Sequence, residues 1–416
     1  MFLARHRGYL LEKGDVILPE DTTGAMTGLK VIDLTRVLGG PYATQILADH
    51  GACVIKVEPP QGDEVRDWGP PFFEGNASYF LGLNRNKRSL ALDLSKNSGR
   101  NVFFRLLEDA DVLIENLKTG TLEKWHLGYE EVLQAKFPKL IHCRISGYGA
   151  DGPLGGLPGY DAIIQAYAGW FSVNGNSKSG PTRIGIPMVD MGTGLYSVIG
   201  ILMALRERQQ SGVGQFIDMA LYDCAVSLMH PHIPNYMLSN ETPVPTGNAH
   251  PNISPYDRFH TKTVDIFIGA GNDRAFKRLC SAIEADDIAL DHRFATSKSR
   301  NEHREALTKV LSDIIIKEDG EALCDRLMRA GVPAGPILNT AQVMDAEHTK
   351  HRKMNARCDW WRGAGIPIKF GRTPGAINTP PPEFGVHGRE ILKEHEFSDE
   401  EIDQLIRDNV LIEKRG

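Results

Sequence analysis

Asp190 is the residue whose setting most clearly suggests chemistry. An apolar run ends at Asp190, Gly192 and Gly194 follow, and then an amphipathic helical pattern begins. This order predicts a carboxylate at or near a helix N-terminus, where backbone N–H groups and the helix dipole favour its ionised form. An ionised carboxylate beside small residues can accept a large ligand and act as a nucleophile. The commonest role of an aspartate at a helix start is an N-cap, so both interpretations stand at this point.

A glycine motif elsewhere resembles a dinucleotide site but lacks the required context. Gly147–Gly152 matches G-x-G-x-x-G after a predicted strand. Pro153 and further glycines and prolines follow, so no helix opens there to receive a pyrophosphate. We therefore expect no dinucleotide at this loop.

Histidines and cysteines do not form a metal-binding pattern. His230 and His232 lie beside prolines without a third ligand nearby in sequence. The six cysteines include no C-x-x-C pair, which argues against a zinc site and against a disulfide framework. We expect reduced thiols, a cytoplasmic location and no metal.

The segment Asn84–Arg88 is a compact basic cluster before a predicted strand. A solvated turn is the usual meaning of such a run. The alternative is a clamp for the phosphates of a nucleotide-bearing ligand, which Arg and Lys suit by charge and geometry.

Composition limits the class of protein. The chain has 416 residues, of which 41% are hydrophobic and 24% charged, with a net charge of −6. This is ordinary for a globular protein of two or three domains, and it gives no electrostatic case for binding nucleic acid. No stretch of 18 apolar residues is present, so we expect no membrane span.

The first half of the chain alternates predicted strands with predicted helices. Strands at 29–34 and 53–57 flank a helix at 41–49, which is a βαβ pattern. Further strands are predicted at 89–94, 112–114 and 139–145, with a helix at 98–109. We expect a doubly wound, Rossmann-like α/β domain with sites at the carboxyl ends of its strands.

The second half changes character. Apolar residues from Leu195 to Leu205 share one helix face, and a strand is predicted at 215–220. Six prolines in 231–258 predict a linker without regular helix, and 371–385 should be extended. A strand at 264–269 and helices near 273–285, 300–316 and 320–330 predict a smaller α+β domain. Ser398 with Glu401 is a capping box that starts a last helix.

These patterns divide the chain as follows: a disordered extension at 1–25, a large domain at 26–225, a linker at 226–258, a small domain at 259–340, and a linker with a C-terminal return to the large domain at 341–416.

Several stretches in the same order resemble the class III CoA-transferases, which include formyl-CoA:oxalate CoA-transferase and the CaiB/BaiF proteins. They are GLKVIDLTRVLGGP at 28–41, DHGACVIKVEP at 49–59, LNRNKRSLALDL at 83–94, DVLIEN at 111–116, SGYGADGP at 146–153, the Asp190 region, GVGQ at 212–215, GNDR at 271–274 and GVPAGP at 331–336.

The resemblance implies a mechanism for Asp190. The aspartate at this position attacks an acyl-CoA thioester, which gives a mixed anhydride and CoA thiolate. The thiolate then forms an aspartyl-CoA thioester, and an acceptor acid takes the CoA by the reverse steps. Gly192 and Gly194 would leave room and backbone N–H groups for oxyanions. CoA is a substrate here, and no permanently bound cofactor is expected.

The resemblance also implies CoA contacts. They match Val37, Leu38, Gly39, Leu92, Asp93, Asn116, Lys124 and Tyr160. Lys124 and Pro59 stand where the formyl-CoA branch has arginines, and we expect the cluster from Arg85 to Arg88, Arg88 above all, to compensate.

Tyr160 separates two chemistries carried by the same fold. α-Methylacyl-CoA racemases pair the aspartate with a histidine at the position of Tyr160. Tyrosine, with a pKa near 10, is a poor proton shuttle near neutrality, which favours CoA transfer. A racemase or epimerase and a non-catalytic CoA-binding protein remain the alternatives.

The substrates and assembly are expectations from the resemblance. The loop Thr246–Asn252 holds one glycine, unlike the glycine-rich loop of the oxalate branch, and looks more like relatives acting on dicarboxylic acids such as succinate, glutarate or citramalate. The family's interlocked homodimers suit the long proline-rich linkers.

Overall fold

A computed structural model describes residues 24–415, so the expectation for residues 1–25 lies almost wholly outside the described residues. The chain divides into two compact units. Unit 1 combines the described residues up to Ala168 with Ile186–Met229 and the C-terminal part from His351. Unit 2 consists of Gly169–Gly185 and His230–Lys350.

Unit 1 is built on a six-stranded sheet in which every pairing is parallel. Its strands are β1 (Lys30–Asp33), β2 (Cys53–Glu58), β5 (Lys87–Ala91), β6 (Val112–Glu115), β7 (Ile141–Ser146) and β10 (Phe216–Ala220). The spatial order is β10-β7-β6-β1-β2-β5. Counted along the chain, this is the 3-2-1-4-5-6 order of Rossmann folds, with the switch point between β1 and β6. The predicted mixed α/β fold with a large parallel sheet is confirmed.

Helices cover both faces of this sheet because the strands are apolar on both sides. One face packs on α3 (Asn97–Leu107), α18 (Gly388–Glu394) and α19 (Asp399–Arg407) in a single hydrophobic core. The C-terminal segment thus belongs to unit 1, and α19 begins with the predicted Ser398–Glu401 capping box.

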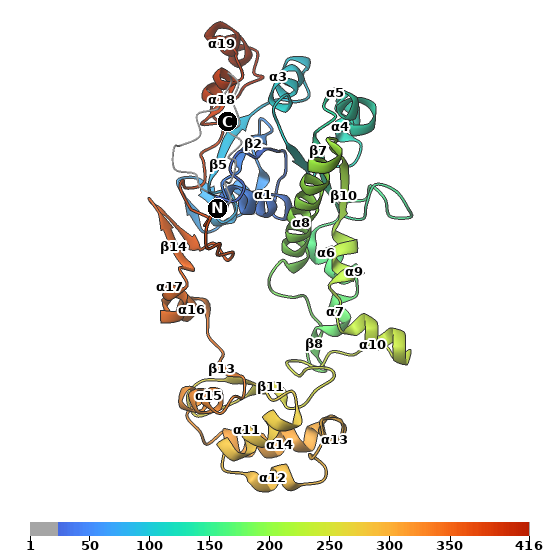
Figure 1. Cartoon of the computed structure of the whole chain (residues 1–416), viewed down its shortest axis with the longest axis vertical. Helices are drawn as coiled ribbons and strands as arrows, with labels where there is room; N and C mark the ends of the chain where they lie inside the picture. Colours follow the sequence, from blue (N-terminus) through green and yellow to red (C-terminus); the bar gives the residue numbers. More distant parts are fainter. Residues whose placement is uncertain (1–23, 416) are drawn as a thin grey trace, which may run out of the picture. The chain divides into compact units, whose positions relative to one another are not determined.

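Two helices lie side by side against the sheet, α1 (Gly39–Asp49) and α8 (Met188–Ser211) (Figure 1). They approach closely because glycines face each other. A Cβ on Gly194 would come within 2.6 Å of the Gly39 carbonyl oxygen. Small residues therefore set the distance between the two helices at their N-terminal ends.

Helix α8 is the one described helix that is long and apolar enough to cross a membrane. Its mean hydropathy is 1.6 over the best window, and 44% of that window is buried inside the structure. Core helices of globular proteins pass the same test, and α8 packs on α1, β7 and α9 (Leu221–Ser227).

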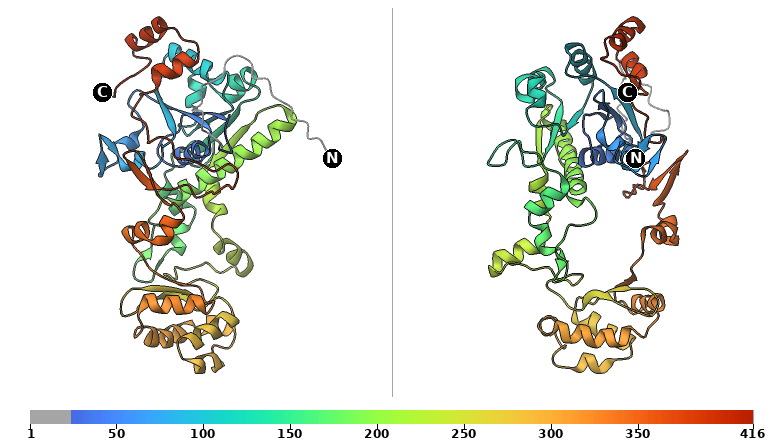
Figure 2. Two further views of the ribbon diagram at one scale, coloured as in Figure 1. Left: turned by 60° about the vertical axis from the view of Figure 1, so that its left-hand side comes forward. Right: turned by 180° about the vertical axis from the view of Figure 1, so that it is seen from behind.

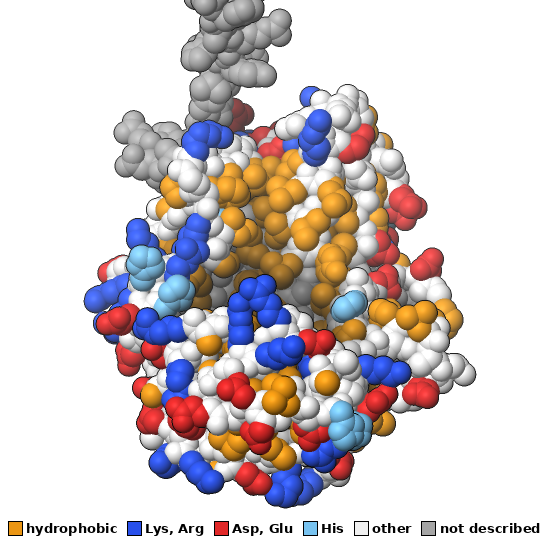
Figure 3. Space-filling view, turned by 60° about the horizontal axis from the view of Figure 1, so that its bottom comes forward, with side chains coloured by type: hydrophobic (Ala, Val, Ile, Leu, Met, Phe, Trp, Pro, Cys, Tyr) orange, Lys and Arg blue, Asp and Glu red, His pale blue; other side chains and the backbone are white. Residues whose placement is uncertain are grey.

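Unit 2 contains an antiparallel three-stranded sheet of β11 (Tyr256–Phe259), β12 (Ile266–Gly269) and β13 (Ala334–Pro336). Helices α11 (Asp273–Ala282), α14 (Arg304–Ile315) and α15 (Gly320–Arg329) share its hydrophobic core (Figure 2). Acidic and basic side chains are interspersed over the face of this unit in the foreground of Figure 3.

The prediction that 231–258 contains no regular helix is wrong. Helix α10 spans His232–Ser239 and includes Pro234. A proline in the first turn costs little because the N–H that it lacks has no helical acceptor there. The predicted extended segment 371–385 holds neither helix nor strand.

The remaining elements are η1 (Glu64–Arg66), β3 (Phe72–Phe73), β4 (Asn76–Ala77), α2 (Ser78–Leu81), α4 (Thr121–Lys124), η2 (Tyr129–Leu133), α5 (Gln134–Lys136), α6 (Asp161–Tyr167), α7 (Trp170–Val173), β8 (Gly175–Asn176), β9 (Gly180–Pro181), α12 (Asp286–Leu290), α13 (Ser297–Glu302), α16 (Thr340–Asp345), α17 (Glu347–His351), β14 (Asn355–Cys358) and β15 (Trp361–Ala364).

Candidate active site

A cavity of about 300 Å³ opens at the carboxyl ends of three neighbouring strands. Its walls come from the loops after β1, β6 and β7, together with the start of α8. This is the switch point of the sheet, where α/β folds place their ligands. The cavity brings together six residues predicted from the sequence, namely Val37, Leu38, Gly39, Asn116, Tyr160 and Asp190.

Asp190 is the third residue of α8 and lies partly buried at the cavity wall. Burial, with a smaller contribution from the charge of Asp161, raises its pKa from 3.8 to about 7. The Asp190 carboxyl is therefore harder to ionise than that of an ordinary aspartate, against the expected preference for the charged form. Removal from water outweighs the helix dipole at this position.

The cap of α8 is Asp161, which is buried at the first residue of α6. Its Oδ2 accepts hydrogen bonds from the backbone N–H of Val189, at 2.8 Å, and of Asp190, at 3.2 Å. Asp190 itself makes no side-chain capping bond. The N-cap interpretation of Asp190 is thus wrong, and its carboxylate has no hydrogen-bond donor among the described residues.

The expected role of two glycines as oxyanion donors is also wrong. Gly192 and Gly194 lie inside α8, where the helix uses their backbone N–H groups. A Cβ on Gly192 would meet Leu228 at 2.7 Å, so this glycine serves packing, as Gly194 does against Gly39.

Free backbone donors lie instead at the start of α1. This helix begins at Gly39 without a side-chain cap, so the N–H groups of Gly39 and Gly40 have no acceptor among the described residues. Gly39 is next to the catalytic candidate, because a Cβ there would lie 3.0 Å from the Asp190 carbonyl oxygen.

Asn116 braces the loop after β1. Its Oδ1 accepts a hydrogen bond from the Arg36 N–H at 2.8 Å, and its Nδ2 donates to the Arg36 carbonyl at 2.7 Å. The side-chain amide therefore joins the loop after β6 to the loop after β1 across the switch point.

A second cavity, of about 500 Å³, adjoins the first along the sheet edge. Leu92 and Asp93 line it, as does Pro59. The two cavities share Arg36, Leu117 and Lys118 in their walls. A long ligand could therefore extend from Asp190 past β1 toward β2 and β5.

The structure does not bring Arg88 to either cavity. Its guanidinium donates to Glu390 and Glu394, at 2.9 and 2.7 Å. Arg85 pairs with buried Asp49 at 2.6 Å, and Lys87 is buried near Asp33. The charged side chains of the cluster form structural ion pairs, so the solvated turn is wrong, and neither of these two cavities supports the phosphate clamp.

Lys124 is likewise outside both cavities and exposed at the end of α4. Its neighbours Thr121 and Trp125 line the second cavity instead.

The sequence interpretation missed two cations and two aromatic residues. Arg36 and Lys118 line both cavities, and neither side chain is paired with a described acid. Each lies three residues after the end of a strand of the parallel sheet, β1 or β6, and this position could have identified it. Trp68 contacts the rings of Tyr79 and Tyr160, at centroid distances of 5.5 and 6.5 Å. Burial and the nearby acids Asp190 and Asp161 raise the pKa of Tyr79 to about 12.

The model of CoA-transferase family III matches residues 26–388. The chain belongs to CoA-transferase family III. This family III CoA-transferase is 39% identical over 383 residues to the succinate–glutarate CoA-transferase of Agrobacterium fabrum, covering 89% of this chain and 96% of the relative. It is also 39% identical to the succinyl-CoA:mesaconate CoA-transferase of Haloarcula hispanica, with 89% and 96% covered.

Solved structures agree with the assignment. A CaiB/BaiF family protein from Brucella suis is 41% identical, with a TM-score of 0.81 over 89% of this chain and 99% of the other. In this CoA-transferase, no histidine is among the described residues that line the cavity of Asp190.

Proposed function

We propose that the protein moves CoA from an acyl-CoA donor, such as succinyl-CoA, to a small carboxylic or dicarboxylic acid, with Asp190 as nucleophile. The observation that carries this proposal is the carboxylate of Asp190, which meets the switch-point cavity without a hydrogen-bond donor of its own. A carboxylate that only stabilised the fold would be paired with a cation or hydrogen-bond donor, or would cap a helix.

The chemistry begins with the ionised Asp190. Its oxygen attacks the thioester carbonyl, the C–S bond breaks, and CoA thiolate leaves a mixed anhydride. The thiolate then attacks the aspartyl carbonyl and releases the donor acid as a carboxylate, which leaves an aspartyl-CoA thioester. The acceptor carboxylate repeats the sequence in reverse, so atoms and charge balance without a cofactor.

The free N–H groups at the start of α1 are the best placed oxyanion donors. Both glycines line the cavity, Gly39 lies beside the Asp190 main chain, and a helix N-terminus favours negative charge. Pro41, the next residue, has no backbone N–H and therefore leaves no further donor to satisfy.

The two adjoining cavities offer room for the CoA chain. Arg36 and Lys118 lie where they meet and have free charge for phosphates or for a substrate carboxylate. Arg36→Ala should raise the KM for acyl-CoA about tenfold, as expected for a charged contact of roughly 1.4 kcal/mol. Steady-state kinetics at fixed acceptor concentration measure this change.

A dicarboxylic acceptor fits the relatives best. The three curated relatives at 39% identity are named for succinate, glutarate and mesaconate, all dicarboxylic acids. A homodimer remains a prediction from the resemblance.

The racemase alternative has no support from the site geometry. Tyr160 stands at the cavity where that chemistry needs a proton-exchanging histidine.

A transfer assay separates these functions. The protein is incubated with succinyl-CoA and glutarate, mesaconate or oxalate, and the product CoA esters are separated by chromatography. We expect transfer to at least one dicarboxylic acid. Deuterium wash-in at the α-carbon of a 2-methylacyl-CoA, without any CoA transfer, would instead establish the racemase.

A further inference from the structure

The turn between β1 and α1 contains a strained residue. Val37 has φ of +68°, in the left-handed region that a β-branched side chain rarely adopts. Such strain costs about 1–3 kcal/mol and persists only where surrounding contacts hold it. The turn leads directly into Leu38 and Gly39, which line the cavity beside Asp190.

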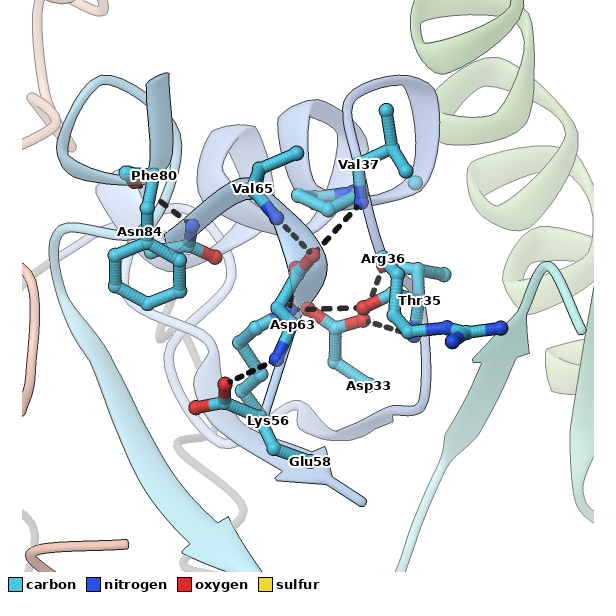
Figure 4. Close-up of polar contacts among 12 residues, drawn as sticks. Asp33, Thr35, Arg36, Val37, Lys56, Glu58, Asp63, Val65, Phe80 and Asn84 are labelled. Atoms are coloured by element: carbon cyan, nitrogen blue, oxygen red, sulfur yellow. Dashed lines mark hydrogen bonds and ion pairs between the residues drawn. The ribbon is translucent and has the colours of Figure 1, made fainter. Parts of the chain in front are cut away.

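A buried ion pair contacts the turn from below, as Figure 4 shows. Lys56 projects from β2, and its Nζ donates to the Thr35 carbonyl at 2.8 Å and to Asp63 Oδ2 at 2.9 Å. The other oxygen of Asp63 accepts from the N–H groups of Val37 and Val65, each at 3.3 Å. Both charged side chains are 0% exposed.

Two further side chains complete the hold on this turn. Asp33 accepts hydrogen bonds from the N–H and hydroxyl of Thr35. Asn116 engages both backbone groups of Arg36. Each residue from Thr35 to Val37 is therefore tied through its backbone to a side chain from another part of the sheet edge.

Asp63 and Lys56 line neither cavity, so they have no route to touch substrate. We infer that the buried pair of Asp63 and Lys56 is a positioning device that holds the left-handed turn at Val37 and thereby directs the first N–H groups of α1 toward the acyl group on Asp190. This inference rests on the proposed function of Asp190.

Asparagine at position 63 is a sharp test because its shape is nearly unchanged. Asp63 accepts hydrogen bonds at both oxygens, from Lys56 on one side and from two N–H groups on the other. Asparagine has one acceptor oxygen, and its NH₂ group must face a donor. Asp63→Asn therefore loses either the hydrogen bond from Lys56 or the hydrogen bonds from the two backbone N–H groups, whichever way the amide turns.

The matched control is Asp49→Asn. Asp49 is another buried acid of unit 1, paired with Arg85 at 2.6 Å, but it lies at the opposite end of α1. Both variants should lose thermal stability. Only Asp63→Asn should slow the single-turnover acylation of Asp190 by succinyl-CoA, by at least about tenfold, with little change in the KM for succinyl-CoA.

Hydrogen exchange gives a readout independent of activity. The peptide spanning 34–41 should exchange faster in Asp63→Asn than in Asp49→Asn or the parent protein. Slow exchange of the Thr35, Arg36 and Val37 amides in the parent protein is also expected, and this needs no variant. Exchange there as fast as in an unstructured peptide would overturn the inference even if Asp63→Asn did not fold.

Val37→Gly supplies a rescue test because glycine adopts positive φ freely. The rate loss caused by Asp63→Asn should be several-fold smaller in a Val37→Gly background than in the parent background. Equal losses in both backgrounds, or wild-type acylation by Asp63→Asn, would contradict a role in holding the turn. Failure of the parent protein to acylate Asp190 at all would instead refute the proposed function, while the exchange result would still report on the turn.

Discussion

The buried acids Asp33 and Glu58 and the partly buried Asp190 have opposite environments within unit 1. Asp33 and Glu58, beneath the turn, are surrounded by cations and donors, and these hold the pKa of both carboxyls below their usual range in spite of burial. Asp190, a short way along the same sheet edge, has no such partners, and burial raises its pKa to about 7. The same side-chain chemistry therefore serves structure in one region and reactivity in the other.

The difference lies in where the partners are. Arg66 gives Glu58 two hydrogen bonds, at 2.8 and 2.7 Å. At the start of α8, the N–H groups of Val189 and Asp190 are instead used by Asp161. Asp161 thus caps the helix and leaves the Asp190 carboxylate free for an acyl group.

Removing the unpaired acid should have the largest effect on activity. Asp190→Asn should lower CoA transfer by at least about 10³-fold, the scale of losing a covalent nucleophile. Its thermal stability at pH 8 should match or exceed that of the parent protein, because an unpaired buried charge is removed. Transfer assays and thermal unfolding measure the two effects. Substantial activity in this variant would show that another group forms the covalent bond.

Removing the cation that pairs with a buried acid should lower stability strongly and change activity little. Arg66→Met leaves Glu58 buried without its cation and should lower the free energy of unfolding by about 3–5 kcal/mol. Urea unfolding monitored by circular dichroism measures it. At a temperature where the variant is folded, kcat should change far less than in Asp190→Asn. A loss below about 1 kcal/mol would mean that the paired acids do not hold the fold.

The raised pKa of Asp190 predicts a pH dependence of both activity and stability. Acylation requires the carboxylate, so log(kcat/KM) should rise by one per pH unit up to about pH 7 and then level off. Between about pH 4 and 7 the native state holds the proton that the unfolded state has lost. The contribution of this group to the unfolding free energy therefore falls as pH rises through that window. Asp190→Asn should lack this fall. A profile already level at pH 5 would show that Asp190 is ionised like an ordinary aspartate.

The smallest effect is expected at Arg88. Its guanidinium is committed to Glu390 and Glu394 and lies outside both cavities. Arg88→Ala should leave the affinity for CoA within about twofold, in contrast to Arg36→Ala. Isothermal titration of both variants with CoA makes the comparison. A tenfold loss of CoA affinity in Arg88→Ala would show that Arg88 binds the phosphates of CoA.

The sequence predicted the elements whose patterns are local. Periodicity and capping residues predict the six strands of the parallel sheet, β12, α1, α3, the capped α19 and a carboxylate near the start of α8. They do not predict β11 or β13 of the small sheet. The hydrogen bonds and ion pairs that determine the role of each charged side chain join residues far apart in the sequence. Asp161 lies 29 residues from Asp190, and Arg88 reaches Glu390 across 302 residues. Local sequence patterns therefore do not predict the ion pairs of the basic cluster, the Asp161 cap of α8 or the left-handed turn at Val37.

Trapping the acyl-enzyme tests the central claim most directly. The protein is incubated with succinyl-CoA, treated with hydroxylamine or borohydride, digested, and the peptide containing Asp190 is weighed and fragmented by mass spectrometry. The account predicts a hydroxamate or a reduced side chain at Asp190, absent without succinyl-CoA and absent in Asp190→Asn. An unmodified Asp190 peptide during active CoA transfer, or the adduct at another residue, would contradict it.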